Sequence, residues 1–438
     1  MAAMTAIDLP PPPTPEPAHD VRVLIVAEHA SARFGGEAVL PLHYFRLLLG
    51  LGQPVWLVTH ARVRDELTAL FPDAGDRIHY VEDHALHKLM DRLSAYLPAR
   101  LSNVTLGFVS RLHTQLLQRR LARRLIGQHG IQVVHQPMPV SPKEPSVLHG
   151  LGVPVVIGPM NGGMTYPRAF RSRSEWALHA VEATGRAASG LLNRLLPGKR
   201  HAALLLAANE RTQAALPATQ GQVALLVENA VDMGLWQPPP PRAPSGVTHF
   251  VFMGRLVDFK APGVAVAAFI DAAQQAPMTL TLLGDGPLGP ALRAQAEAAG
   301  VRATAPGQVG KVWFAGWLAQ TECAARLREA DALLLPSLRE CGGAVVLEAM
   351  ACGLPTVVAA WGGPLDYVTP ECGVLVAPDD AATLHRGFVT AMVKLAQEPA
   401  WRAELGRAGH QRVQTHFNWD RKIEVMRAYY RQIVSSPA

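Results

Sequence analysis

Several features that would place this chain in a common class are scarce or missing. The only cysteines among 438 residues are Cys323, Cys341, Cys352 and Cys372. Their spacing fits neither a disulfide framework nor a zinc-binding motif, so we expect a reducing compartment, the cytoplasm. No run approaches the roughly 18 consecutive apolar residues that a membrane-spanning helix needs. Charged residues make up 17% of the chain and hydrophobic residues 49%, which excludes a disordered protein.

The length of the chain predicts two domains, because one hydrophobic core rarely grows beyond about 250–300 residues. Residues 1–19 are rich in proline and lack the basic flank and apolar centre of a secretion signal, so we expect a flexible tail. Residues 237–246 read "QPPPPRAPSG", which suits neither a sheet interior nor a helix. We therefore predict an N-terminal domain over 20–236, a linker over 237–246 and a C-terminal domain over 247–416.

The net charge of +6 points to basic segments in the first half. Residues 92–124 carry seven arginines and no acidic residue, at spacings that suit an amphipathic helix. Two interpretations stay open: a solvated helix face, or a surface that meets anionic lipid or a phosphate-bearing substrate. No aromatic residues alternate with these charges as they do in nucleic-acid readers, so we expect no nucleic-acid partner.

Short β-rich runs alternate with helical patterns along both halves. This alternation predicts a mostly parallel sheet with helices on both faces, that is, two doubly wound Rossmann-like α/β domains. The predicted strands lie in 20–28, 54–60, 131–137 and 154–159, and in 248–254, 278–284, 311–316, 332–337 and 355–360.

Ligands of open α/β sheets bind beyond the carboxyl ends of the strands, so the loops there are the candidate sites. The loop "LGDGPLG" (283–289) contains the spacing G-x-G-x-x-G. A dinucleotide site would also need an acidic residue about 20 positions further on, and the strand there ends without one. Pro287 also lies inside the would-be phosphate turn. We therefore expect no nicotinamide or flavin cofactor, and interpret Gly284 and Gly286 as a tight turn near a ligand.

The segment "ECGGAVVLE" (340–348) carries the strongest functional signal. Small residues open a helix there, and its free amides and dipole favour an anion such as a diphosphate. Glu348 interrupts an apolar run, and a ribose could donate hydrogen bonds to it. Glu340 would meet another hydroxyl-rich group. The alternative from spacing alone is that Glu348 pairs with a basic side chain and Glu340 is solvated.

Six motifs in order resemble those of retaining GT-B glycosyltransferases of family 4. "ECGGAVVLE" resembles their E-x7-E element, and the others are "FMGRLVDFKAPG" (252–263), "LLGDGP" (282–287), "VWFAGWL" (312–318), "ADALLLPS" (330–337) and "EAMACGLPTVVAAWGGPLDYV" (348–368). The first half resembles the family more weakly, through "RFGGEAVLPLHYFRLLLGLG", "LLLAANERTQAAL" and "LVENAVDMGLW". The resemblance implies two Rossmann-like domains facing a central cleft, with residues 417–438 forming a helix that returns to the N-domain.

The resemblance also assigns roles to matched positions. Arg255 and Lys260 would hold the donor diphosphate, Glu340 would face the sugar hydroxyls, and Glu348 would accept from the ribose. These three, Arg255, Lys260 and Glu340, are the expected catalytic residues. The expected donor-binding residues are Gly35, Gly36, Gly254, Gly284, Gly286, Cys341, Gly342, Gly343, Ala344 and Glu348.

The chain departs from the family pattern at two places. Glu340 is followed by "CGG" where relatives often read "GFG", which puts the sugar preference in doubt and leaves Cys341 as a small packing residue or a reactive thiol. After "PVVIG" many relatives carry a histidine, and this chain has "PMNGG". Asn161 and Gly162 are therefore expected at the acceptor side, and His135 either contributes there or is structural.

The implied activity is transfer of a sugar from a nucleotide-diphosphate sugar to a saccharide or lipid-linked acceptor, with retention, in cell-envelope polysaccharide or glycolipid synthesis. The sequence contains no Asp-x-Asp, and Arg255 and Lys260 could replace a divalent ion, so no metal and no cofactor are expected. The expected location is cytoplasmic, with peripheral attachment to the inner face of the membrane left open. A GT-B nucleotide-sugar epimerase, a noncatalytic nucleotide-sugar-binding scaffold and an NAD-linked oxidoreductase are the alternatives.

Overall fold

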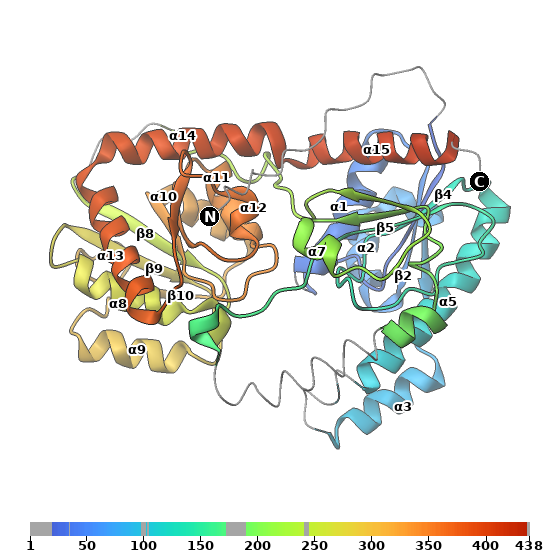
Figure 1. The fold of residues 1–438 in the computed structure, drawn as a ribbon, viewed down its shortest axis with the longest axis horizontal. Coiled ribbons are helices and arrows are strands. Elements are labelled where there is room, and N and C mark those ends of the chain that lie inside the picture. Colours follow the sequence, from blue (N-terminus) through green and yellow to red (C-terminus); the bar gives the residue numbers. More distant parts are fainter. Residues whose placement is uncertain are drawn as a thin grey trace. The chain divides into compact units, whose positions relative to one another are not determined.

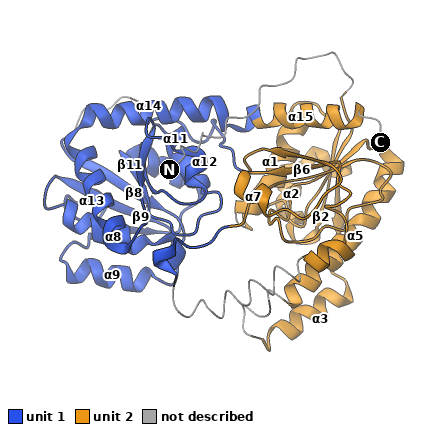
Figure 2. Cartoon of the chain, in the orientation of Figure 1, with its two compact units in different colours: residues 1–9, 164–175, 229–421 blue, residues 10–163, 176–228, 422–438 orange. Residues whose placement is uncertain are grey.

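The structure is a computed structural model that describes residues 20–34, 36–97, 102, 105–171, 190–240 and 245–435. The chain divides into two compact units (Figure 2). Among the described residues, unit 1 contains 164–171 and 229–421, and unit 2 contains all others. The predicted tail over 1–19 and part of the predicted linker, 241–244, lie outside the described residues.

Unit 2 is built on a parallel sheet of seven strands in the order β3-β2-β1-β4-β5-β6-β7 (Figure 1). The five inner strands are buried at every residue, which explains their continuous apolar sequences. The strands are β1 (Val23–Val26), β2 (Val55–His60), β3 (Ile78–Val81), β4 (Val133–Gln136), β5 (Val155–Met160), β6 (Leu204–Ala207) and β7 (Gln222–Leu225). The helices are α1 (Gly36–Gly50), α2 (Arg64–Leu70), α3 (Ala85–Ser94), α5 (Leu106–His129), α7 (Glu210–Ala214) and most of α15 (Trp419–Ser435).

Unit 1 is built on a parallel sheet of six strands in the order β10-β9-β8-β11-β12-β13 (Figure 1). The strands are β8 (Thr248–Met253), β9 (Met278–Leu283), β10 (Val312–Gly316), β11 (Ala332–Leu335), β12 (Thr356–Ala359) and β13 (Gly373–Val376). The helices are α8 (Pro262–Ala272), α9 (Gly289–Ala298), α10 (Gln320–Glu329), α11 (Ala344–Ala351), α12 (Pro364–Tyr367), α13 (Ala381–Gln397) and α14 (Pro399–His416). The predicted fold class, two parallel doubly wound α/β sheets, is confirmed.

The C-terminal helix α15 packs within unit 2 from Lys422 onward. The Arg427 guanidinium donates to the Gln53 side-chain oxygen at 2.7 Å and to Asp20 at 2.7 Å, while Tyr430 is completely buried. These contacts attach the last helix to the start of the sheet that it covers. Among the helices that the structure describes, none is both long and apolar enough to cross a membrane.

Candidate functional site

In unit 1, two loops at the carboxyl edge of the sheet bring Lys260 and Glu340 together. Lys260 ends a 3₁₀ turn (Asp258–Lys260) after β8, and Glu340 lies between β11 and α11. The backbone amides of Leu338 and Arg339 donate to the Phe259 carbonyl at 2.8 and 3.2 Å, which ties the two loops to each other. The Lys260 ammonium donates to the Glu340 carboxylate in an ion pair. Residues 80 positions apart in the sequence thus form one charged pair.

The start of α11 is open beside this pair. Gly343 precedes the helix with φ of 73°, and no side chain caps the first turn. A Cβ at Gly343 would lie 3.0 Å from the Glu340 Cγ, so the side chain of Glu340 packs against bare backbone there. The helix begins at Ala344, and Gly342 and Gly343 are buried while Cys341 is exposed. Uncapped amides at a helix start are suited to an anion.

Glu348 lies one turn inside α11 and is half-buried. Burial raises the pKa of its carboxyl to about 7, and the positive charge of Lys260 opposes this rise. Over the described ranges, no side chain donates a hydrogen bond to this carboxylate and none forms an ion pair with it. The alternative in which Glu348 pairs with a base is therefore wrong, and so is a merely solvated Glu340, which is 8% exposed and paired with Lys260.

Arg255 and the predicted glycine turn lie on the same edge. Arg255 follows β8 and is exposed, and its guanidinium has no hydrogen bond or ion pair with the described part of the chain. Gly284 has φ of 133°, and a Cβ there would lie 2.1 Å from the carbonyl oxygen of Gly254. Gly286 approaches Leu256 in the same way, with a Cβ position 2.6 Å from its carbonyl oxygen. These glycines are explained by close packing between the loops after β8 and β9.

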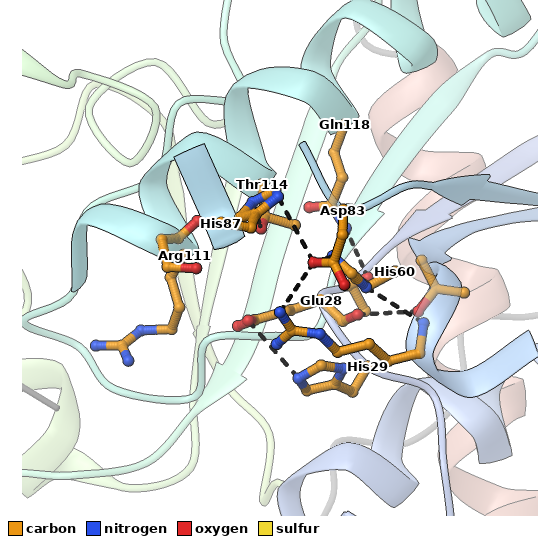
Figure 3. A network of polar contacts seen from close by, with 12 residues as sticks. Glu28, His29, His60, Asp83, His87, Arg111, Thr114 and Gln118 are labelled. Atoms are coloured by element: carbon orange, nitrogen blue, oxygen red, sulfur yellow. Dashed lines mark hydrogen bonds and ion pairs between the residues drawn. The ribbon is translucent and has the colours of Figure 1, made fainter. Parts of the chain in front are cut away.

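In unit 2, a second polar cluster gathers at the carboxyl ends of β1, β2 and β3 (Figure 3). Glu28 and His29 follow β1, His60 ends β2, and Asp83 follows β3. The Glu28 carbonyl accepts from the His60 amide at 3.0 Å, and the buried Gln118 side chain donates to the Ala27 carbonyl at 2.7 Å. The ends of these strands are therefore fixed against one another and against α5.

His60, Asp83 and His87 have potential metal-ligating atoms within 4.8 Å of one another. The Nδ1 atom of His60 accepts from the Arg62 amide at 3.2 Å, and the Nδ1 atom of His87 accepts from the His84 amide at 3.0 Å. The remaining nitrogens then carry hydrogens. His60 Nε2 lies 3.4 Å from Asp83 but is buried without a hydrogen-bond partner in the described residues, whereas His87 Nε2 lies 3.1 Å from the Thr114 hydroxyl.

A metal ion would need a free lone pair on each histidine, and the Nδ1 lone pairs of His60 and His87 already accept from backbone amides. The Arg62 guanidinium also forms an ion pair with the Asp83 carboxylate at 2.9 Å. Burial lowers the pKa of His60 to about 4 and also lowers the pKa of His87, so both rings are neutral near pH 7. The cluster fits a hydrogen-bonded frame that holds Arg62 better than it fits a metal centre.

The expected acceptor-side residues Asn161 and Gly162 belong to a different network in unit 2. The Asn161 amide donates to the buried Glu228 carboxylate at 2.6 Å, and the Gly162 amide donates to the Thr212 hydroxyl at 3.1 Å. Burial raises the pKa of Glu228, and its backbone carbonyl accepts from the buried Lys422 ammonium at 2.6 Å. Asn161, which follows β5, therefore supports the buried carboxylate of Glu228, which follows β7.

His135 does not fit an acceptor-side role, because the structure buries it completely. Its Nε2 lies 2.7 Å from the Gly158 carbonyl, and its Nδ1 lies 2.7 Å from the Tyr430 hydroxyl. The Nε2 contact joins β4 to β5, the Nδ1 contact holds α15 on the sheet, and burial lowers the pKa of the ring to about 4. The structural interpretation of this histidine is the one that the contacts favour.

Two donor-binding predictions fall on the glycine loop of unit 2. Gly35 lies outside the described residues, and Gly36 begins α1 with no atom within 4 Å of a Cβ added there. Sequence reasoning missed Glu28, His60 and Asp83 nearby. Glu28 and His60 end predicted strands, so the carboxyl-end rule applied to the first half would have found these two, whereas Asp83 follows a strand that was not predicted.

Residues 247–398 match the family described as "Glycosyl transferases group 1". The chain is 34% identical over 197 residues to glycogen synthase of Mycobacterium tuberculosis, covering 44% of this chain and 45% of that protein. It is 36% identical over 195 residues to D-inositol 3-phosphate glycosyltransferase of Actinosynnema mirum, covering 41% and 43%. The chain thus spans less than half the length of each of these relatives.

The whole chain is similar in structure to Anabaena Alr3699/HepE in complex with UDP. The TM-score is 0.62 with 15% identity, and the match covers 94% of this chain and 100% of that one. This likeness concerns the fold, and the sequence match concerns the unit that holds Lys260, Glu340 and Glu348. The chain therefore has the GT-B fold, and its residues 247–398 are similar to group 1 glycosyltransferases.

Proposed function

We propose that this protein transfers a sugar from a nucleotide-diphosphate sugar to a hydroxyl group of a saccharide or lipid-linked acceptor, with retention of the anomeric configuration. The observation that carries the proposal is the cluster in unit 1: the Lys260–Glu340 pair beside the open start of α11, with Glu348 one turn inside. The UDP bound by Anabaena HepE supports a nucleoside diphosphate as the donor's leaving group.

The proposed roles follow from charge and hydrogen-bonding capacity. Arg255, Lys260 and the amides at the start of α11 neutralise the diphosphate, whose negative charge grows as it leaves. Glu340, oriented by Lys260, accepts hydrogen bonds from the transferred sugar. Glu348 accepts from the ribose hydroxyls, which replaces the water that its half-buried carboxylate lacks.

The reaction breaks the bond between the anomeric carbon and the diphosphate oxygen and forms a bond from the same face to the acceptor oxygen. The acceptor's hydroxyl proton passes to the departing phosphate, so the products are the glycoside and the protonated nucleoside diphosphate. In this proposal fixed cations replace a divalent ion, because the sequence contains no Asp-x-Asp, Lys260 pairs with Glu340 beside the helix start, and Arg255 lies in the same loop after β8.

A panel of nucleotide-sugars tests this function. The protein is incubated with each donor and mixed saccharide acceptors in buffer containing EDTA, and NMR follows nucleotide release and the anomeric proton of the product. We expect an acceptor-dependent product with the donor's anomeric configuration at a rate that EDTA does not change. Free sugar without acceptor would support the epimerase, binding without turnover would support the scaffold, and inhibition by EDTA would contradict fixed-cation catalysis.

An exposed apolar stripe on α3 and on the turn that follows it supports peripheral attachment to the inner face of an anionic membrane as the setting of this activity. Leu89, Leu93, Tyr96 and Leu97 follow one another at helical spacing and are 49%, 42%, 86% and 36% exposed. Basic residues accompany this stripe on α3 and on the adjacent α5: Lys88, Arg92, Arg120, Arg123 and Arg124 are all exposed. Apolar side chains flanked by cations suit the surface of an anionic bilayer.

Cosedimentation with vesicles tests the attachment. Leu93→Ser combined with Tyr96→Ser should reduce binding to vesicles of phosphatidylglycerol and phosphatidylcholine by about tenfold, while Leu51→Ser, which also changes an exposed leucine of unit 2, should not. Equal binding of all three proteins, or equal binding to vesicles of phosphatidylcholine alone, would contradict it.

A further inference from the structure

A cavity of about 370 Å³ opens in unit 2 beside the polar cluster of Figure 3. Its wall is formed by the residues after β1, by Arg62 after β2, and by helices α3 and α5. The lining is polar: Glu28, His29, Arg62, Asp91, Ser110 and Arg111 contribute to it. The volume is within the range of small-molecule sites. None of the residues assigned to the donor line this cavity.

The two arginines of the cavity are already neutralised by carboxylates of the chain. The Arg62 guanidinium lies 2.9 Å from Asp83 and 3.6 Å from Asp91, and the Arg111 guanidinium lies 2.8 Å from Glu144. A phosphate that entered would have to compete with these carboxylates for the guanidinium groups. It would also meet the negative charge of Glu28. The cavity is therefore a poor site for an anion despite its arginines.

Glu28 and His29 are the groups that remain available to a ligand. The nearest side-chain nitrogen to the Glu28 carboxylate that the structure records is His29 Nε2 at 3.6 Å, which is too far for a hydrogen bond. The Nδ1 atom of His29 is buried and has no hydrogen-bond partner in the described part of the chain. Burial lowers the pKa of His29 to about 4, so its ring is neutral, and the Nε2 atom beside Glu28 is left to accept or donate one hydrogen bond.

The position of Glu28 is fixed even though its carboxylate is not engaged. Its carbonyl accepts from the His60 amide at 3.0 Å and from the Thr59 hydroxyl at 3.1 Å. The His29 ring stacks on Phe34 with centroids 4.9 Å apart. A rigid carboxylate beside a neutral imidazole is suited to hydroxyl groups, which donate to the one and pair with the other.

We propose that this cavity binds the acceptor as a neutral polyhydroxyl ring, with Glu28 and His29 bonded to its hydroxyl groups, and that it discriminates against phosphorylated acceptors. This inference rests on the proposed function and names the substrate class for it. It separates this chain from a relative such as the D-inositol 3-phosphate glycosyltransferase of Actinosynnema mirum, whose name describes a phosphorylated acceptor.

Saturation-transfer NMR on the full-length protein with UDP present tests the inference. The probes are glucose, galactose, mannose and myo-inositol, each compared with a monophosphate of the same ring. We expect at least one neutral ring to bind at least tenfold more tightly than its phosphate. Glu28→Gln should weaken that binding about tenfold and leave UDP affinity unchanged, whereas Asp73→Asn, at an exposed acid of the same unit, should change neither.

Three outcomes would overturn the inference: no neutral ring binds, the phosphates bind more tightly, or Glu28→Gln binds the ring as the unaltered protein does. Failure of the proposed function would look different, because UDP binding and donor turnover in unit 1 would then be absent. A protein that turns over its donor but prefers phosphorylated acceptors would retain the function and lose this inference.

Discussion

The two clusters lie at equivalent edges of two similar sheets, yet they leave different groups free. In unit 1 Lys260 is paired with Glu340, but the exposed Arg255 guanidinium has no hydrogen bond or ion pair with the described part of the chain, and no side chain caps the start of α11. In unit 2 the cavity arginines Arg62 and Arg111 are neutralised by carboxylates, and the Glu28 carboxylate forms no ion pair with either of them. One edge is suited to an anion and the other to neutral hydroxyl groups. The same fold thus supports two chemistries through the side chains at the strand ends.

The largest expected effect is the loss of the unit 1 cation. Lys260→Ala should lower the turnover number about 100- to 1000-fold, because it removes a fixed charge that acts on the leaving diphosphate. The turnover number is measured from nucleotide release at saturating donor. Lys394→Ala is the matched control, since that exposed ammonium lies over Trp401, away from the cluster.

A loss of activity in Lys260→Ala would also follow from unfolding, since Glu340 would lose its partner. The thermal unfolding midpoint distinguishes the two causes, and Glu340→Gln combined with Lys260→Ala removes the orphaned charge. Turnover within threefold of the unaltered protein in either variant would break the comparison, because the anion site of unit 1 would then not depend on this cation.

A second prediction concerns the loops that carry the unit 1 cluster. Gly284→Ala should lower the free energy of unfolding by about 3 kcal/mol, because the new methyl group would clash with the Gly254 carbonyl oxygen and φ is 133°. Gly307→Ala is the control for φ alone: φ there is 77° and nothing lies within 4 Å, so about 1 kcal/mol is expected. Urea unfolding measures both, and equal losses would contradict the role of close packing.

A third prediction uses the pKa of Glu348, which burial raises from 4.5 to about 7. The folded protein therefore holds this proton more tightly than the unfolded chain does, so the contribution to stability falls as pH rises from about 4.5 through 7. If the ribose hydroxyls donate to the ionised Glu348 carboxylate, the donor should bind about tenfold more weakly at pH 6 than at pH 8. Isothermal titration with UDP-glucose measures this, and Glu348→Gln should remove the dependence. A flat profile in the unaltered protein would contradict the ribose role.

The smallest expected effect concerns the charge preference of the unit 2 cavity. Asp83→Asn leaves Arg62 with only the more distant Asp91, at 3.6 Å, so part of its charge becomes available to a ligand. The affinity for a phosphorylated ring should rise about threefold to fivefold relative to its neutral counterpart. Competition NMR with glucose and glucose 6-phosphate measures the ratio. If the ratio stays unchanged, the carboxylates do not set the charge preference of the cavity.

The sequence predicted the inner strands well and the edges less well. Continuous apolar runs marked strands such as β2, β5 and β12, which are buried along their whole length. The strands β3, β7 and β13 were not predicted, because they lie at sheet edges where exposed or half-buried residues break the apolar run. The edge strand β10 was predicted nonetheless, and the buried inner strand β6 was missed. A parallel strand that is buried on both faces has a continuous apolar sequence, which makes it easier to recognise.

The two clusters differ in the same way. Gly284 and Gly343 come in short motifs that can be recognised, and the resemblance of these and the neighbouring motifs to a known family assigned roles to Lys260 and Glu340. The unit 2 cluster has no local motif, because Glu28, His60 and Asp83 come together only through the order of the strands. The tautomers that fit this cluster to a hydrogen-bonded frame depend on backbone amides, whose positions no residue spacing predicts.

A crystal structure of the protein with UDP, grown in buffer containing EDTA, tests the central claim most directly. We predict that the diphosphate contacts Arg255, Lys260 and the amides of residues 342–344, with the ribose on Glu348 and no metal density beside it. A diphosphate bound to unit 2, or one that appears only when a divalent cation is added, would contradict the account.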